Sequence, residues 1–291
     1  MSARLLDFSN AGKIRQAVAD TDREALRVMP FDTISIGACI ELCCALQDWR
    51  AASNECGLET FQRLAAEMPM LSLCDERLTE TIHHPERSRF RVGGGELVLS
   101  AVAQQQAFQE RAWNEFQQGL VDQLKRCGFQ PGFAIALSAA FAEIAQNVPD
   151  HSAVADHEMA ASLVGYLAMP GELHFAVGDL GRGVLASLRE NPRWASMRDS
   201  RQAILATLEH GATRKPEHPE GTGLKLALKS FVDRNGILSV RSGDATAHVG
   251  RDNDGRHIVM GFAPKLPGTC VTASCLARGV PSERPLPKLR V

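Results

Sequence analysis

Three polar residues lie four positions apart in one segment of the chain: Glu143, Asn147 and His151. On a helix this spacing places the three side chains on one face. An amide oxygen there can ligate Mg²⁺, a hard cation that prefers oxygen ligands and keeps several of its waters. A carboxylate one turn away can take a proton from a water or hydroxyl that attacks a phosphate. The competing interpretation is a solvated helix face, which is the commoner origin of such a pattern.

A second group of residues, Asp179, Gly181 and Gly183, directly follows the apolar segment LHFAVG. A carboxylate at a strand end can accept a hydrogen bond from the exocyclic amine of adenine, and glycines let a base approach the backbone because they lack Cβ. One alternative is a simple turn. Another is a dinucleotide-binding fingerprint, because GRGVLA fits G-x-G-x-x-A. That fingerprint requires a second strand about 20 residues later, where RQAILATLEH is typical of a helix.

A third group opens a predicted helix at residue 223. Its members are Gly221, Thr222, Gly223 and Leu224. Free backbone N–H groups at a helix N-terminus bind phosphate, and glycines allow its close approach. Three basic side chains would add positive charge: Arg214, Lys215 and Lys225. A loop that ends in an ordinary helix cap is the alternative, and the absence of G-x-x-x-x-G-K-[ST] excludes a P-loop.

The elements that must position these groups begin at about residue 131. Hydrophobic periodicity predicts helices at 132–148, 199–210 and 223–234, and strands at 161–168 and 173–178. Three extended segments follow, ILSVRSG, HIVMGFA and TCVTASCL. The order is helix, strands, helix, loop, helix, strands. It predicts an α+β fold, a two-layer α/β sandwich in which helices cover one face of a mostly antiparallel sheet.

The preceding residues predict a smaller N-terminal α/β region at 1–95. It has helices at 9–28 and 36–52, with MPFDTISI as a short strand between them. RFRVGGGELVL alternates and turns at its glycines, which predicts a domain edge. A connecting segment at 96–130 is expected to form a long helix over 99–127, whose apolar face packs on the next domain or on a second copy. The α+β sandwich spans 131–278, and the tail at 279–291 is predicted to be disordered or lightly docked.

The overall charge excludes two classes of partner. The 32 Lys and Arg residues and 34 Asp and Glu residues give a net charge of −2, so we expect neither nucleic acid nor a membrane as a partner. No apolar run approaches the ~20 residues that span a bilayer, and the first residues do not have the apolar run that is typical of a signal peptide. We therefore expect a cytoplasmic protein. The eight cysteines include no C-x-x-C pair, which predicts buried, reduced thiols.

The order and spacing of these motifs resemble the nucleotide-binding domain of the gyrase, heat-shock chaperone, histidine kinase and MutL (GHKL) superfamily. An E-x-x-x-N helix precedes D-x-G-x-G after a strand, a variable loop closes at G-x-G-L, and Gly268-Thr269 opens a final strand. The similarity covers about residues 110–278. It implies a Bergerat-type fold that binds ATP and Mg²⁺, in the histidine-kinase-like or anti-sigma-kinase-like ATPase branch.

The resemblance implies roles at the reacting end of the nucleotide. Asn147 is implied as the Mg²⁺ ligand and Glu143 as the general base, and His151 matches a histidine that follows this motif in many bacterial members. One departure from the pattern is Pro149. A proline inside a helix removes a hydrogen bond and bends the chain, which predicts that the helix ends early and moves His151.

The resemblance also implies the remaining nucleotide contacts. Asp179 is implied as the adenine anchor, with Thr269 nearby through a water, and Gly181 and Gly183 line the base pocket. The residues implied at the phosphates, under a lid at about 190–222, are Lys215, Gly221, Thr222, Gly223 and Leu224. Lys225 replaces a glycine of the usual G-x-G-L-G-L pattern.

The implied activity is ATP hydrolysis or phosphorylation of a protein partner. Small bacterial kinases of the anti-sigma type are similar to the C-terminal domain, and Glu143 would there deprotonate a Ser or Thr of the partner. The alternative is a nucleotide-gated switch without chemistry, in which lid closure changes partner binding. The N-terminal region faintly resembles STAS-type regulatory domains. We expect a protein as the partner, and a homodimer is the other assembly that the pattern allows.

Overall fold

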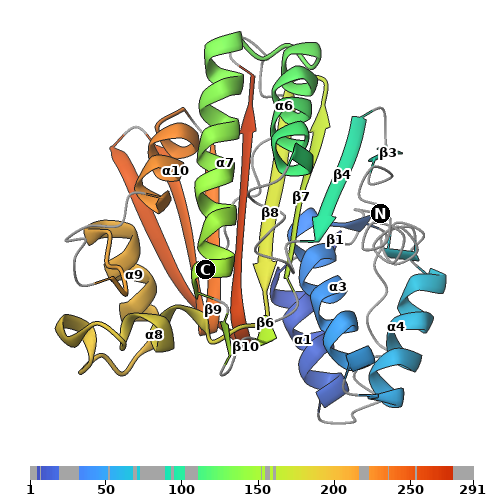
Figure 1. Ribbon diagram of the computed structural model, residues 1–291, viewed down its shortest axis with the longest axis vertical. Helices are drawn as coiled ribbons and strands as arrows, with labels where there is room; N and C mark the ends of the chain where they lie inside the picture. Colours follow the sequence, from blue (N-terminus) through green and yellow to red (C-terminus); the bar gives the residue numbers. More distant parts are fainter. Residues whose placement is uncertain are drawn as a thin grey trace.

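A six-stranded sheet forms the centre of the protein (Figure 1). The computed structural model describes residues 5–6, 8–19, 33–51, 53–67, 71–72, 89–92, 95–101, 111–151, 153–154, 158–159, 162–215, 223–234, 236–252 and 254–277. In spatial order the strands are β3 (Arg89–Val92), β4 (Gly95–Ala101), β7 (Ser162–Met169), β8 (Glu172–Asp179), β10 (Gly255–Leu276) and β9 (Ile237–Asp252). Every neighbouring pair is antiparallel, so the predicted antiparallel α+β class is confirmed.

The helices divide into an N-terminal and a C-terminal set. The N-terminal helices are α1 (Phe8–Ala19), α3 (Ile36–Ala51) and α4 (Glu55–Glu67). The C-terminal helices are α6 (Arg111–Arg126), α7 (Pro131–His151), α8 (Gly183–Leu188), α9 (Ser200–His210) and α10 (Gly223–Phe231), with 3-10 turns η3 (Pro192–Trp194) and η4 (Val232–Arg234). Two small pairs complete the described elements: β1 (Leu5–Leu6) with β2 (Thr33–Ile34), and β5 (Ala153–Val154) with β6 (Glu158–Met159).

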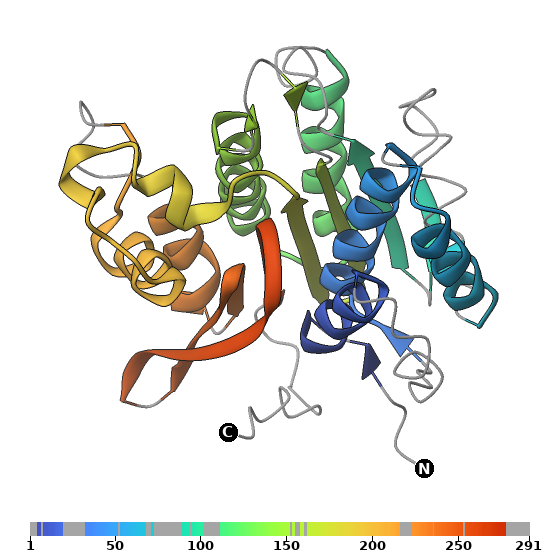
Figure 2. The same cartoon turned by 90° about the horizontal axis from the view of Figure 1, so that it is seen from below.

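Helices cover both faces of the sheet. Along β8, Phe175 and Val177 pack in the core beneath α6, α7 and α10, whereas Ala176 between them packs against α1 and α3. Figure 2 shows these two sets of helices on opposite sides of the strands. The prediction of a two-layer sandwich therefore omitted the layer of N-terminal helices on the second face of the sheet. This layer is needed because β7 and β8 are apolar on both faces, and an apolar face must be buried against another element.

A strand occupies residues 95–101, where the sequence pattern predicted the start of a long helix. β4 pairs with β7, because strand pairing overrides local helical preference. The successive β4 residues Leu97 and Val98 pack in the cores on opposite faces of the sheet. The described part of the helix runs from Arg111 to Arg126. Its apolar face is covered within the chain: Trp113 and Phe116 stack with centroids 5.2 Å apart, and Phe116 lies 5.8 Å from Phe141 of α7.

Three other predicted boundaries are wrong. Helix α7 runs to His151, past Pro149. A proline in the last turn costs the helix only one hydrogen bond, and the burial of Phe141 and Ile144 holds the helix against the core. The second and third extended segments form a single strand, β10, with register shifts between Phe262 and Thr269. The first extended segment, ILSVRSG, is the start of a longer strand, since β9 runs on to Asp252. The strands predicted at 161–168 and 173–178 and the helices predicted at 199–210 and 223–234 agree with the structure to within about two residues, the last of them ending in the 3-10 turn η4.

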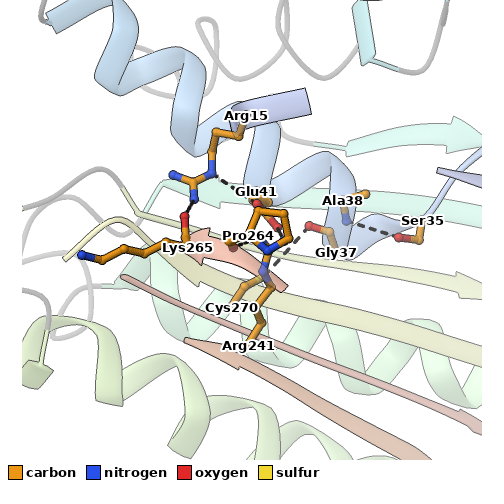
Figure 3. Close-up of polar contacts among 9 residues, drawn as sticks. All are labelled: Arg15, Ser35, Gly37, Ala38, Glu41, Arg241, Pro264, Lys265 and Cys270. Atoms are coloured by element: carbon orange, nitrogen blue, oxygen red, sulfur yellow. Dashed lines mark hydrogen bonds and ion pairs between the residues drawn. The ribbon is translucent and has the colours of Figure 1, made fainter. Parts of the chain in front are cut away.

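A buried ion pair joins the N-terminal helices to the sheet (Figure 3). Arg241 Nη1 of β9 lies 2.6 Å from Glu41 Oε2 of α3, and neither side chain is exposed. Arg15 of α1 reaches the other oxygen, with Nε 3.3 Å from Oε1. Burial raises the pKa of Glu41, and the charges of Arg241 and Arg15 oppose that shift. The pair is thus a desolvated contact whose two partners depend on each other.

The same two arginines hold the irregular part of β10. Arg241 Nη2 donates to the carbonyl oxygen of Pro264 at 2.7 Å, and Arg15 donates to that of Lys265. Gly12 of α1 leaves room for the guanidinium, since a Cβ there would lie 2.1 Å from Arg241 Nη2. The N-terminal layer therefore contacts the strand irregularity directly.

Removing the charge of Glu41 should destabilise the whole chain. Glu41→Gln leaves the Arg241 guanidinium buried beside a neutral group, and we expect a loss of about 3–5 kcal/mol in unfolding free energy, measured by urea denaturation. The matched control is Glu115→Gln, which removes the exposed Arg111–Glu115 pair on α6. Its unfolding free energy should equal that of the wild type within experimental error. Equal losses in the two variants would contradict the assigned role of the buried pair.

Candidate functional site

A row of four polar residues crosses the sheet at the end of β8. Its members, paired strand by strand, are Ser162, Asp179, Thr269 and Ser242. Directly paired residues of antiparallel strands share a face. The neighbouring row on the same face, two positions away on each strand, is apolar. It consists of Val164, Val177, Val271 and Val240, which lie in the core beneath α7 and α10. The row therefore marks the point where this apolar core gives way to polar chemistry.

Helix α7 brings its polar residues to the same end of the sheet. The Gly171 N–H at the β7–β8 turn donates to the carbonyl of Cys127 just before α7, at 2.7 Å. Helix and strand thus run in the same direction from that point, as Figure 1 shows. Glu143 and Asn147, both half-buried, lie toward the C-terminal end of α7, and so toward the end where Asp179 lies.

The amide of Asn147 is oriented by its own helix. Its Nδ2 donates to the Glu143 carbonyl oxygen at 3.0 Å, which leaves the amide oxygen as the group able to ligate a cation. Among the described residues, no group of three or more His, Cys, Asp or Glu could hold a metal ion. The side chain of His151 lies outside the described part. A cation bound here would take the Asn147 amide oxygen as its protein ligand and complete its coordination with other oxygens, as Mg²⁺ does in proteins.

Asp179 is a buried carboxyl group at the end of β8, with 8% of its surface exposed. Burial raises its pKa to about 7, and backbone hydrogen bonds from Gly181 and Thr269 limit the rise. The Gly181 N–H donates to Oδ1 at 2.7 Å. Gly268 packs so closely that a Cβ would lie 2.5 Å from Oδ1. The group is held in one geometry and changes its charge near neutral pH.

Ser242 holds the glycine loop against the sheet, a role that sequence reasoning missed. Its hydroxyl accepts from the Val184 N–H at 2.9 Å and donates to the Gly268 carbonyl at 2.9 Å, and Thr269 Oγ1 donates to it at 3.3 Å. Gly183 has φ +75°, and a Cβ there would lie 2.8 Å from Ser242 Oγ. The polar serine at the end of the apolar segment ILSVRSG was the only available signal. The structure thus brings Asp179, Gly181, Gly183 and Thr269 together.

The described part of the predicted lid, residues 190–215, has a defined structure with its own internal contacts. Glu190 forms ion pairs with both Arg182 and Arg214, the latter at 3.5 Å, and Asn191 Nδ2 donates to the Thr213 carbonyl at 2.9 Å. A small separate core supports α8 and α9, and consists of Leu188, Ala203, Ala206 and Ala212. Lys215 is half-buried at the end of this segment. These contacts join the two ends of the described lid segment.

The start of α10 lies on the site's side of the molecule. The Gly236 N–H donates to the Phe231 carbonyl at 2.9 Å, so the helix ends beside the start of β9, which pairs through Ser274 with His174 in the first half of β8. The N-terminus of α10 therefore points toward the end where β8 finishes. Gly223 begins this helix, and Leu224 is partly buried against the main core. Gly221 and Thr222 lie outside the described residues.

Comparison of the chain with protein-family models, curated proteins and solved structures returns no match. The resemblance to GHKL proteins therefore stays a prediction that rests on the motifs. Among the described residues, no helix is both long enough and apolar enough to cross a membrane. The cysteines of the described residues are buried, except the half-buried Cys56, in agreement with the predicted burial.

Asp179 should lower the stability of the empty protein above neutral pH. The unfolded chain loses this proton near the ordinary aspartate pKa of 3.8, whereas the folded chain keeps it until about pH 7, so rising pH removes stability between these two values. Asp179→Asn cannot ionise. We expect the variant to be more stable by a few kcal/mol at about pH 8, at about 1.4 kcal/mol per pKa unit.

Urea denaturation of both proteins across this pH range measures the difference. The gap should shrink as the pH falls toward about 4 and should be constant above about 7. A wild type that is at least as stable as Asp179→Asn at about pH 8 would show that the carboxylate is stabilised, and would contradict the described burial.

Proposed function

We propose that this chain binds ATP with Mg²⁺ in a Bergerat-type site and hydrolyses it or transfers its γ-phosphate to a protein partner. The observation that carries the proposal is the buried Asp179 carboxyl, held by Gly181 and Thr269 at the end of the apolar core. A carboxyl group is costly to bury, and functional sites are where such costs are retained. The order of the surrounding motifs supports the same interpretation.

Asp179 would recognise the base. Its carboxylate accepts a hydrogen bond from the exocyclic amine of adenine, and it repels the carbonyl oxygen that guanine has at the same ring position. Gly181 and Gly183 carry no side chains, and the contacts of Ser242 keep their loop in place. Discrimination between the two purines then comes from one ionised group in a desolvated setting.

The triphosphate would extend from this base toward α7 and α10. The amide oxygen of Asn147 would ligate Mg²⁺, whose role is to neutralise charge on the phosphate oxygens. The free N–H groups and the positive end of the dipole at the start of α10 favour an anion. Lys215, at the end of the described lid segment, would add positive charge.

Glu143 would act as the general base. It lies one helical turn before Asn147, so both side chains project from one face of α7. The carboxylate takes the proton of a water or of a Ser or Thr hydroxyl as that oxygen attacks the γ-phosphorus. The bond between the γ-phosphorus and the bridging oxygen breaks, and ADP leaves with the electron pair.

Calorimetric titration with ATP, with and without Mg²⁺, tests the proposed binding. The wild type should bind ATP more tightly when Mg²⁺ is present, and Asn147→Ala should lose this gain, which we expect to be about tenfold or about 1.4 kcal/mol. Gln146→Ala is the matched control, because Gln146 is the exposed neighbour on the same helix. Absence of ATP binding by the folded wild type would refute the proposed function.

Turnover separates catalysis from a nucleotide-gated switch. Glu143→Gln keeps the size of the side chain but cannot take a proton, so phosphate release from ATP should fall by about 100- to 10,000-fold while ATP affinity is retained. The measurement is phosphate release under single-turnover conditions. Undiminished turnover in Glu143→Gln would remove this residue from the base role, and a tight-binding wild type without turnover would favour the switch.

A further inference from the structure

Ser162, the first residue of β7, carries an unsatisfied hydroxyl in the interior. The residue is 0% exposed, and its Oγ has no hydrogen-bond partner in the described part of the chain. A buried hydroxyl without a partner costs free energy, because it has lost its hydrogen bonds to water. Alanine would fill the same strand position without that cost, so the serine calls for an explanation.

The position of Ser162 supplies one. It pairs directly with Asp179 across the β7–β8 ladder, on the face that α7 and α10 cover. The β-carbons of directly paired residues lie about 4.5–5.5 Å apart. The other members of the row are satisfied: Asp179 accepts from Gly181, and Thr269 donates to Ser242. The unsatisfied group of the row is therefore the one beside the proposed adenine anchor.

We propose that Ser162 is a further base-contacting residue, whose hydroxyl donates to a ring nitrogen of adenine beside the amine that Asp179 holds. This inference rests on the proposed ATP-binding function. The amine of adenine is flanked by ring nitrogens that accept hydrogen bonds, so a carboxylate and a hydroxyl side by side match the donor and acceptor order of this edge. The ligand then supplies the partner that Ser162 lacks.

The proposal predicts opposite effects on the empty and the loaded protein. Ser162→Ala removes an unsatisfied buried group, so the melting temperature of the empty protein should rise by about 2–4 °C. The same variant loses a contact to the base, so the dissociation constant for ATP should rise by about 3- to 10-fold. Thermal unfolding without nucleotide and calorimetric titration with ATP and Mg²⁺ measure the two effects.

Ser138→Ala is the matched control. Ser138 is a buried serine of α7 whose hydroxyl donates to the Gln117 carbonyl of α6 at 3.4 Å. Its loss should lower the melting temperature slightly and leave ATP affinity unchanged. Ser162→Cys is a second variant of nearly the same size as serine. Its thiol is a weak donor, so ATP affinity should again fall without a cavity.

Three results would overturn the inference. ATP affinity equal to that of the wild type in Ser162→Ala and Ser162→Cys would show that the base does not contact the hydroxyl. A lower melting temperature of Ser162→Ala would show a hydroxyl that is already satisfied, for example by a buried water, and so has only a structural role. Failure of the folded wild type to bind ATP would remove the proposed function together with this inference, whereas the first two results leave ATP binding intact.

Discussion

The irregular part of β10 is the feature on which the candidate site depends, and adjacent residues of β9 hold it from opposite faces. Arg241 donates to the Pro264 carbonyl on the side of the N-terminal helices, and Ser242 donates to the Gly268 carbonyl on the side of α7. Beyond these contacts β10 resumes its register and pairs with the end of β8 at Asp179. The ion pair with α3 and the candidate base site are thus connected through the adjacent residues Arg241 and Ser242 and the segment of β10 that both of them hold. The N-terminal layer is part of the scaffold that positions the site.

Two buried polar groups at one end of the sheet lower the stability of the fold. Burial raises the pKa of Asp179 to about 7, and Ser162 beside it has an unsatisfied hydroxyl. A sequence selected only for stability would place apolar residues at both positions. Proteins commonly retain such destabilising residues at functional sites, where a bound ligand supplies the missing interactions. The two residues therefore support a site for a polar, planar ligand edge more strongly than either residue alone.

The sequence predicted the parts of the fold that have a strong local pattern. The strands around 162–179 and the helices at 200–210 and 223–231 follow from periodicity and from glycine signals. The second face of the sheet could not be predicted, because it depends on contacts between residues as distant as Glu41 and Arg241. The same holds for β4, whose pairing with β7 decides its conformation. At the site, Asp179 could be named from its motif, whereas Ser162 and Ser242 acquire a role only through register.

Titration of the wild type and of Asp179→Asn with MgATP at about pH 8 tests whether Asp179 binds the adenine amine. The wild-type carboxylate is ionised at that pH and can accept from the adenine amine, whereas the asparagine can turn its own amine toward it. We predict that the wild type binds MgATP and that the affinity of the variant is weaker by roughly 10- to 100-fold, as expected for a hydrogen bond to a charged group. Equal affinity in two folded proteins would contradict it, and would place the base away from the end of β8.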